Sequence, residues 1–380
     1  MIYETGASIN NETSTETQTG SHSITDADVV EALQKGIREA TREELINHGE
    51  ASLYYNSLTM APLNAMSAAA IARFRAYKPP PFPLWDRLPV RRRAAVLVLL
   101  YADRRGDLRV VITMRAASLR NFSGHAAFPG GKADDLEETP CKGLFPSAVV
   151  PLLILLRVQI ARREAWEEIG LPMDDSKLPK PFRVEHLCYL PPSLARTHLV
   201  VRPCVAFLHA DQRTAGEPAP TVEETMIPRL DAREVAAVFS APFYNFLQAQ
   251  DLPPAPGETL PEGQWYDGFW NHWKDHPWRV HNFYVPVNNQ SISKPRRDSE
   301  QSRLVDKLEK EEEPDGRFKV WGMTARILVD AARIAYAQEP GFEHNDSFGD
   351  EEIIAHADSL GDLGEKIPEK RTEPGDASKM

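Results

Sequence analysis

The nine residues Arg163–Leu171, which read REAWEEIGL, decide how this chain is interpreted. Its three glutamates are spaced i, i+3 and i+4, so a helix would place Glu164, Glu167 and Glu168 on one face. Like charges on one face repel each other, and a divalent cation such as Mg²⁺, which prefers oxygen ligands, would offset the repulsion. A solvated acidic helix face is the commoner meaning of this spacing, so the surrounding residues have to decide.

The residues on both sides of this stretch form a pattern with fixed spacing. A Gly-Gly pair typical of a tight turn precedes the stretch, and Gly170 is suited to ending a helix. The whole arrangement resembles the box of the Nudix hydrolase family, G-x5-E-x7-R-E-U-x-E-E-x-G-U, in which U is a bulky apolar residue. So many fixed positions in order argue against a chance match. The matching positions are Gly131, Glu138, Arg163, Glu164, Glu167, Glu168, Gly170 and Leu171.

The spacing departs from this box in two places. Six residues instead of five separate Gly131 from Glu138, and 24 instead of seven separate Glu138 from Arg163. Removing the 17 residues 141–157 would restore the seven, and would make Thr139 a helix N-cap and Pro140 the first helical residue. We interpret residues 141–157 as an insertion, either a tolerated loop or an intron left in the gene sequence.

A narrower resemblance lies upstream of the box. The segments 114–120 and 122–131 resemble the additional signature of the coenzyme A diphosphatase branch of the family, closest to its fungal peroxisomal members. One extra residue between Gly131 and Glu138 also fits that branch. The resemblance covers about residues 66–345 and includes further matches at 190–192, 200–203, 234–239 and 321–328.

The resemblance implies an α/β fold, the Nudix α/β/α sandwich with a mixed sheet between helices. It implies that Mg²⁺ or Mn²⁺ is held by Glu164, Glu167 and Glu168, with Glu138 assisting and Arg163 orienting a glutamate by ion pairing. The implied reaction is hydrolysis of the pyrophosphate of coenzyme A or an acyl derivative. Its products are 3′,5′-ADP and 4′-phosphopantetheine, or the acyl form of the latter.

Substrate-binding residues are expected in the upstream segment. Arg115 and Arg120 can contact phosphate oxygens bidentately, and the absence of side chains at Gly130 and Gly131 lets backbone N–H groups approach an anion. No general base can be assigned. The only candidates are the neighbouring residues 223 and 224, because these two glutamates fall in an expected loop.

Composition limits the partners. A formal net charge of −11 over 380 residues argues against a general nucleic-acid binder. No apolar run approaches the roughly 20 residues of a membrane span. The last three residues, Ser378, Lys379 and Met380, resemble the C-terminal Ser-Lys-Leu address read by the peroxisomal import receptor. We therefore expect a small-molecule substrate and a peroxisomal location, with the cytoplasm as the alternative.

Composition and periodicity also predict the organisation of the chain. We expect a disordered segment over 1–25, a helical extension and proline-rich linker over 26–89, a Nudix domain over 90–338 with a mobile charged insertion over 290–316, and a polar tail over 339–380. Strands are predicted at 94–101, 108–114, 183–190 and 199–208. Helices are predicted at 66–77, 152–169, 234–247 and 322–337.

Two alternative functions stay open. The chain could hydrolyse another Nudix substrate, such as an oxidised nucleoside triphosphate. It could instead be a non-catalytic Nudix-like binding module, if residues 141–157 dislocate the start of the helix that carries the glutamates.

Overall fold

The computed structural model describes residues 63–116, 119, 124–140, 159–179, 182–210, 234–254, 259–288, 290, 292 and 316–364. Several expectations fall outside these ranges: the disordered N-terminus, almost all of the charged insertion and the last residues of the tail. The insertion at 141–157 also falls outside them, although the residues that flank it are described.

A mixed 8-stranded sheet forms the centre of the described fold. Its strands follow the order β3-β2-β1-β7-β5, β8 pairs with β2, and the short strands β4 and β6 pair with β1 and β7. β1 and β7 run parallel, and the other pairs are antiparallel. The strands are β1 (Arg93–Ala102), β2 (Leu108–Arg115), β3 (Ala126–Ala127), β4 (Gly130–Lys132), β5 (Phe182–Tyr189), β6 (Ser193–Leu194), β7 (Val200–Ala210) and β8 (Val235–Pro242).

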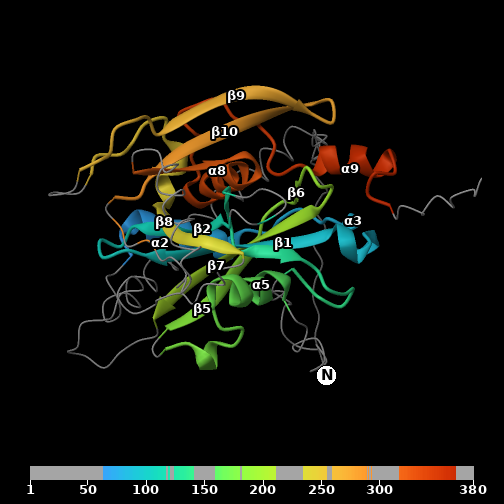
Figure 1. Cartoon of the computed structure of the whole chain (residues 1–380), viewed down its shortest axis with the longest axis horizontal. Helices are drawn as coiled ribbons and strands as arrows, with labels where there is room; N and C mark the ends of the chain where they lie inside the picture. The colour runs from blue at the N-terminus through green and yellow to red at the C-terminus, as the bar shows by residue number, and fades with distance from the viewer. Residues whose placement is uncertain are drawn as a thin grey trace, which may run out of the picture. The chain divides into compact units, whose positions relative to one another are not determined.

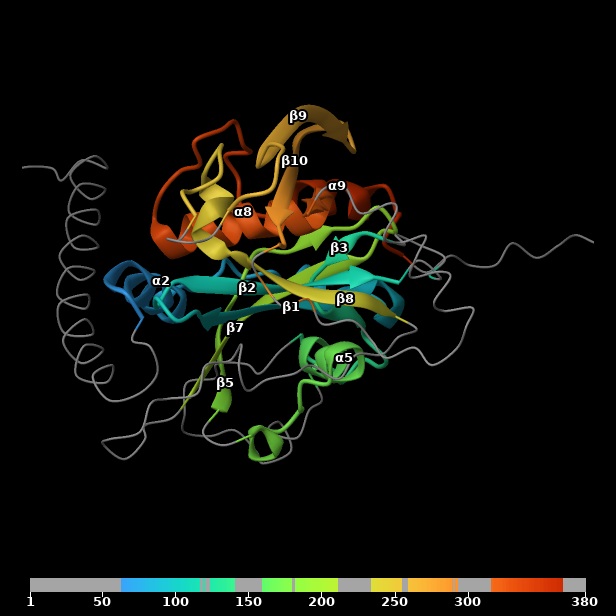
Figure 2. The same cartoon turned by 60° about the vertical axis from the view of Figure 1, so that its left-hand side comes forward.

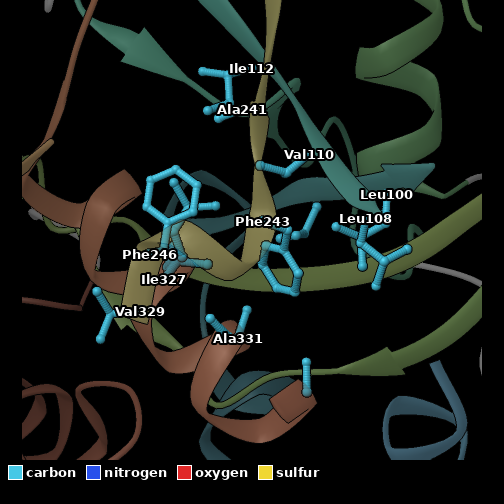
Figure 3. Packing of buried hydrophobic residues seen from close by; sticks show 14 of the residues in the cluster. Leu100, Leu108, Val110, Ile112, Ala241, Phe243, Phe246, Ile327, Val329 and Ala331 are labelled. Carbon is cyan, nitrogen blue, oxygen red and sulfur yellow. The ribbon is translucent and has the colours of Figure 1, made fainter. Parts of the chain in front are cut away.

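The continuous apolar run of β1 is explained by burial on both of its faces. Alternate residues point to opposite sides of a strand, and here Val98 and Leu100 join one core cluster while Leu97 and Leu99 join the other. Figure 3 shows the first cluster, where Leu100 and neighbouring side chains of β2 and β8 pack toward Ile327 and Ala331 of helix α8.

Helices cover both faces of the sheet, which makes the α/β/α sandwich (Figures 1 and 2). The first cluster contains residues of α2 and α8, and the second contains residues of α3, α5 and α9. The helical elements are α2 (Ala65–Ala76), α3 (Leu84–Arg87), η1 (Val90–Arg92), α5 (Ile160–Ile169), η2 (Asp175–Lys177), η3 (Phe243–Leu247), α8 (Gly322–Tyr336) and α9 (Glu351–Ser359). Within the described ranges, no helix is long and apolar enough to cross a bilayer.

A second, 3-stranded antiparallel sheet lies over α8, with the order β11-β10-β9. It consists of β9 (Tyr266–Trp273), β10 (His276–Pro286) and β11 (Arg317–Trp321). Phe283, Val285, Phe318 and Val320 point from it into the first core cluster. The segment 265–284, which is rich in tryptophan and tyrosine, is therefore largely a β-hairpin, and Trp265 at its start is a core residue that is 1% exposed.

The fold corrects three expectations. The predicted helix 234–247 is wrong, because this stretch forms β8 and the 3₁₀ helix η3. The polar tail is wrong for residues 339–364, because α9 buries Ile353 and Ile354. The compact domain also starts before residue 90, since Ile71 and Phe74 of α2 are at most 1% exposed in the first core cluster. All four predicted strands and the helices predicted at 66–77 and 322–337 are confirmed.

Candidate active site

The helix α5 carries the three glutamates of the opening stretch. It ends at Gly170, whose φ of 68° is the left-handed conformation that glycine tolerates at a helix C-terminus. Glu168 is buried at 4% exposure, and the side chain of Glu164 is 14% exposed. The side chain of Glu167 is 45% exposed. The predicted acidic face therefore exists, with two carboxylates turned inward and one toward solvent.

Gly130 and Gly131 allow the acidic face to pack against β4. The N–H of Gly130 donates to Glu168 Oε2 over 3.1 Å. A Cβ atom on Gly131 would lie 2.3 Å from the carboxyl carbon of Glu164. The two residues were expected to let backbone N–H groups approach a substrate anion. In the structure both glycines leave room for carboxylates of α5.

Arg163 connects the upstream glutamate to the helix. Its Nε donates to Glu138 over 2.8 Å, and its Nη1 contacts Glu164 over 3.1 Å and Glu167 over 3.3 Å. Burial alone would lower the pKa of Arg163, but the hydrogen bond to Glu138 and the charges of nearby carboxylates raise it. The arginine thus stays charged and fixes the positions of three glutamates. These contacts are the ones that an orienting role of Arg163, which the family resemblance implies, would require.

The buried carboxylates are electrostatically strained. The pKa of Glu168 is raised to about 8, chiefly by burial; the hydrogen bond from Gly130 and the charge of Arg115 lower it, and the charges of Glu164 and Glu234 add to the rise. Burial likewise raises the pKa of Glu164 to about 7, with Glu167 and Glu234 adding to the effect and Arg163 opposing it. A divalent cation would relieve this cost, because it favours the ionised forms.

The three glutamates of α5 are therefore suitable ligands for a hard cation, but their carboxylates do not point at one common position. Among the described residues, no three histidine, cysteine, aspartate or glutamate side chains converge as a ready ligand set. Glu164 and Glu167 face Arg163, and Glu168 accepts the Gly130 N–H. Two buried, mutually repelling carboxylates and a third exposed one on the same helix face are consistent with Mg²⁺ or Mn²⁺.

Glu234 lies within electrostatic reach of this site, and the sequence interpretation did not single it out. It is an exposed residue directly before β8, its carbonyl accepts the N–H of Ala116, and its charge raises the pKa of both buried glutamates. The sequence did offer one signal, since Glu234 opens a segment that resembles the family. The candidates of the sequence analysis, Glu223 and Glu224, lie outside the described residues.

Arg115 is the described member of the expected arginine pair, and Arg120 lies outside the described residues. The backbone N–H of Arg115 donates to the carbonyl of His125 over 3.0 Å. Its Nε is buried and makes no hydrogen bond within the described part of the chain. Its charge lowers the pKa of Glu168, so the guanidinium lies within electrostatic reach of the acidic face.

The two ends of the insertion lie side by side. The N–H of Ile160 donates to the carbonyl of Thr139 over 2.9 Å, and that of Ala161 donates to Pro140 over 3.2 Å. If residues 141–157 were absent, both bonds would join residues i and i+4, which is the α-helical pattern. Glu138 also keeps its contact with Arg163. The insertion therefore leaves this part of the box in place, although the first described helical residue is Ile160 rather than a residue near 152.

No family model matches the chain. It is 32% identical over 280 residues to "Peroxisomal coenzyme A diphosphatase 1" of Saccharomyces cerevisiae, an alignment that covers 70% of this chain and 75% of the yeast protein. It is 29% identical over 257 residues to "Nudix hydrolase 22, chloroplastic" of Arabidopsis thaliana, which covers 67% of this chain and 60% of the plant protein.

Among solved structures, a Nudix hydrolase from M. Smegmatis is similar with 20% identity and a TM-score of 0.21, over 37% of this chain and 70% of that one. The extent of the similarity to the yeast protein, together with the Gly-Gly turn, the Arg163 cluster and the acidic face of α5, settles the family. The chain belongs to the Nudix hydrolase family, in the branch that its coenzyme A diphosphatase relative represents, and is a hydrolase of pyrophosphate bonds.

Proposed function

We propose that this enzyme hydrolyses the pyrophosphate of coenzyme A or its acyl derivatives, using Mg²⁺ or Mn²⁺, and that it works in peroxisomes. The observation that carries the substrate is the 32% identity to a yeast enzyme named for this activity. The site supports it, since the segment around Arg115 and His125 that resembles the diphosphatase branch lies within electrostatic reach of the acidic face of α5.

Glu164, Glu167 and Glu168 would hold the cation. When bound, the ion would neutralise charge that develops on the phosphate oxygens and make water in the site more acidic. Arg163 and Glu138 keep the glutamates aligned by the contacts described above. Arg115 would bind a phosphate of the substrate, because its buried Nε has an unused donor close to the carboxylates.

Glu234 is the residue that we assign as proton acceptor. A water oxygen attacks phosphorus, the bond from phosphorus to the bridging oxygen breaks, and the proton of the water passes to a carboxylate. Glu234 is exposed directly before β8, and its charge raises the pKa of both Glu164 and Glu168, which supports this assignment.

Product analysis tests the proposal. Purified protein incubated with coenzyme A and Mg²⁺ or Mn²⁺ should release 3′,5′-ADP and 4′-phosphopantetheine, and a chelator should stop the release. Turnover of oxidised nucleoside triphosphates in place of coenzyme A would refute the proposed substrate. Binding without turnover of either would establish a non-catalytic module, which the preserved contact between Glu138 and Arg163 argues against.

A further inference from the structure

The outward face of β11 presents a lysine and a tryptophan beside the active site. Alternation along the strand buries Phe318 and Val320 in the core and turns Lys319 and Trp321 to the other side. Lys319 is exposed, and Trp321 is partly exposed. Tyr284 lies opposite Lys319 in the β10–β11 register and therefore belongs to the same face.

These side chains are arranged as one aromatic and cationic surface. The ammonium nitrogen of Lys319 lies 5.6 Å from the ring centroid of Tyr284 and 5.6 Å from that of Trp321. The hydroxyl of Tyr284 donates to Asp267 over 2.9 Å, which fixes the phenol ring. Within the described residues, no carboxylate lies within ion-pair distance of Lys319. Among those residues its charge is met by ring faces alone, and a ring face leaves the ammonium able to attract an anion.

His125 joins this surface to the catalytic centre. Its ring lies 5.0 Å from the ring of Trp321 at an angle of 59°, and its carbonyl accepts the N–H of Arg115. Burial lowers the pKa of His125, and the charges of Arg115 and Lys319 lower it further. Arg115 and Lys319 therefore both lie within electrostatic reach of His125. The hydrogen bond from Thr324 at the start of α8 to the Ala126 carbonyl, at 3.2 Å, connects the two sheets at this point.

We propose that this surface binds the nucleotide end of the substrate, with the purine base against Trp321 and the phosphate on the ribose at Lys319. The inference rests on the proposed function, which supplies a substrate with a diphosphate, a base and a further 3′-phosphate. An exposed aromatic ring beside a cation is the arrangement that binds a base together with its phosphate. The diphosphate would then lie next to Arg115 and the glutamates.

The test compares four variants on two substrates. Lys319→Met and Trp321→Leu remove the surface. Lys177→Met, at an exposed lysine of η2, and Trp270→Leu, at an exposed tryptophan of β9, are the matched controls. KM is measured for coenzyme A and for the same molecule without the 3′-phosphate. Because the surface can also be tested without turnover, the Kd of 3′,5′-ADP is measured by calorimetry, and melting curves confirm that each variant folds.

Lys319→Met should raise KM for coenzyme A and the Kd of 3′,5′-ADP about tenfold, and should leave KM for the substrate without the 3′-phosphate near its normal value. Trp321→Leu should raise KM for both substrates by about tenfold. The two controls should change neither constant. If KM and Kd stayed unchanged in folded Lys319→Met and Trp321→Leu, the inference would be overturned. The proposed function would still stand if the wild-type protein hydrolysed coenzyme A. If the wild-type protein bound 3′,5′-ADP through Lys319 but did not hydrolyse coenzyme A, the proposed function would be refuted and the binding surface would stand.

Discussion

At the scale of single residues, Arg163 determines how the glutamates of the site are arranged. It contacts Glu138 over 2.8 Å and Glu164 over 3.1 Å, but Glu167 only over 3.3 and 3.4 Å. Glu167 is also the most exposed of the glutamates on α5, with 45% of its side chain accessible. Because its contact with Arg163 is the weakest, Glu167 is the carboxylate that can turn to a cation with the least loss.

We therefore expect Glu167→Gln to remove a metal ligand while keeping the shape of the side chain. Turnover of coenzyme A with Mg²⁺ or Mn²⁺ should fall at least ~10²-fold, because the ion's electrostatic stabilisation of the reaction is worth several kcal/mol. Steady-state kinetics measure the loss. The matched control is Glu352→Gln, at an exposed glutamate of α9. Near-normal turnover by Glu167→Gln would remove Glu167 from the site.

A second residue-scale prediction concerns the close approach of β4 and α5. In Gly131→Ala, the new Cβ would lie 2.3 Å from the carboxyl carbon of Glu164, so Glu164 has to move. We expect turnover to fall at least tenfold, and more Mg²⁺ to be needed for half-maximal rate. In the control Gly341→Ala, the nearest atom to the added Cβ is 3.7 Å away. If Gly131→Ala kept the wild-type Mg²⁺ requirement, the packing of Glu164 on Gly131 would have no part in metal binding.

Residue spacing predicted the acidic face of α5, and the family resemblance implied the roles of Arg163 and Glu138, but neither pointed to Glu234. The three glutamates are neighbouring positions of one helix, and such positions can be read from a short stretch. Glu234 reaches the site through the pairing of β8 with β2, a contact between segments more than 100 residues apart in the sequence. The stretch after it also has an apolar pattern that fits a helix as well as a strand, and this ambiguity led to the wrong element.

At the scale of elements, the first turn of α5 is the part of the fold that the insertion affects. Gln159 is the N-cap residue there, and its side chain makes no capping hydrogen bond. Thr139 and Pro140, which suit the N-cap and first helical positions, lie on the other side of the insertion. The carbonyls of these two residues nevertheless accept hydrogen bonds from Ile160 and Ala161. The bonds of a continuous helix thus persist across an interrupted chain.

Deleting residues 141–157 should therefore raise both the melting temperature and the rate of coenzyme A hydrolysis. The deletion joins the two sides through hydrogen bonds that already exist, restores the cap, and removes a loop whose closure costs about 2–3 kcal/mol. Replacing the 17 residues by a flexible linker of equal length is the control, and should give a smaller gain. Sequencing the transcript is the companion measurement, because an mRNA without the 51 corresponding nucleotides would identify an intron. A deletion that lowered both stability and activity, with the transcript intact, would show that the segment belongs to the fold.

Strands and helices could be predicted from the sequence where their burial leaves a clear apolar pattern, as the following elements show. β1 and β7 are buried on both faces and read as continuous apolar runs, and α8 has a clear amphipathic period. The helix α9 lies in an acidic stretch and buries only Ile353, Ile354 and Ala357, so its few apolar residues did not stand out.

At the scale of the whole molecule, the arrangement of the sheet could not come from periodicity. β1 and β7 are parallel neighbours, although about 100 residues separate them, and strand patterns carry no information about partners. The mixed sheet was expected from the family resemblance alone. Figure 2 shows the result, in which α5 with its glutamates lies below the sheet and α8 with the smaller sheet lies above it. The proposed substrate would contact both layers, because its nucleotide end would lie on β11 of the smaller sheet and its diphosphate near the glutamates of α5.

Location in the cell is also a property of the whole chain, and relatives with similar domains carry different destinations in their names, peroxisomal in yeast and chloroplastic in Arabidopsis. It is therefore encoded outside the shared domain, and we propose that Ser378, Lys379 and Met380 are the residues that the import receptor reads. We expect a fluorescent reporter that ends in residues 369–380 to enter peroxisomes, and the same reporter without the tripeptide to stay in the cytosol. A reporter with Met380→Leu, which completes the usual address, is the positive control for import. If that control were imported while the native sequence stayed diffuse, methionine at the last position would not serve as an address, and the cytoplasm would become the expected site of the enzyme.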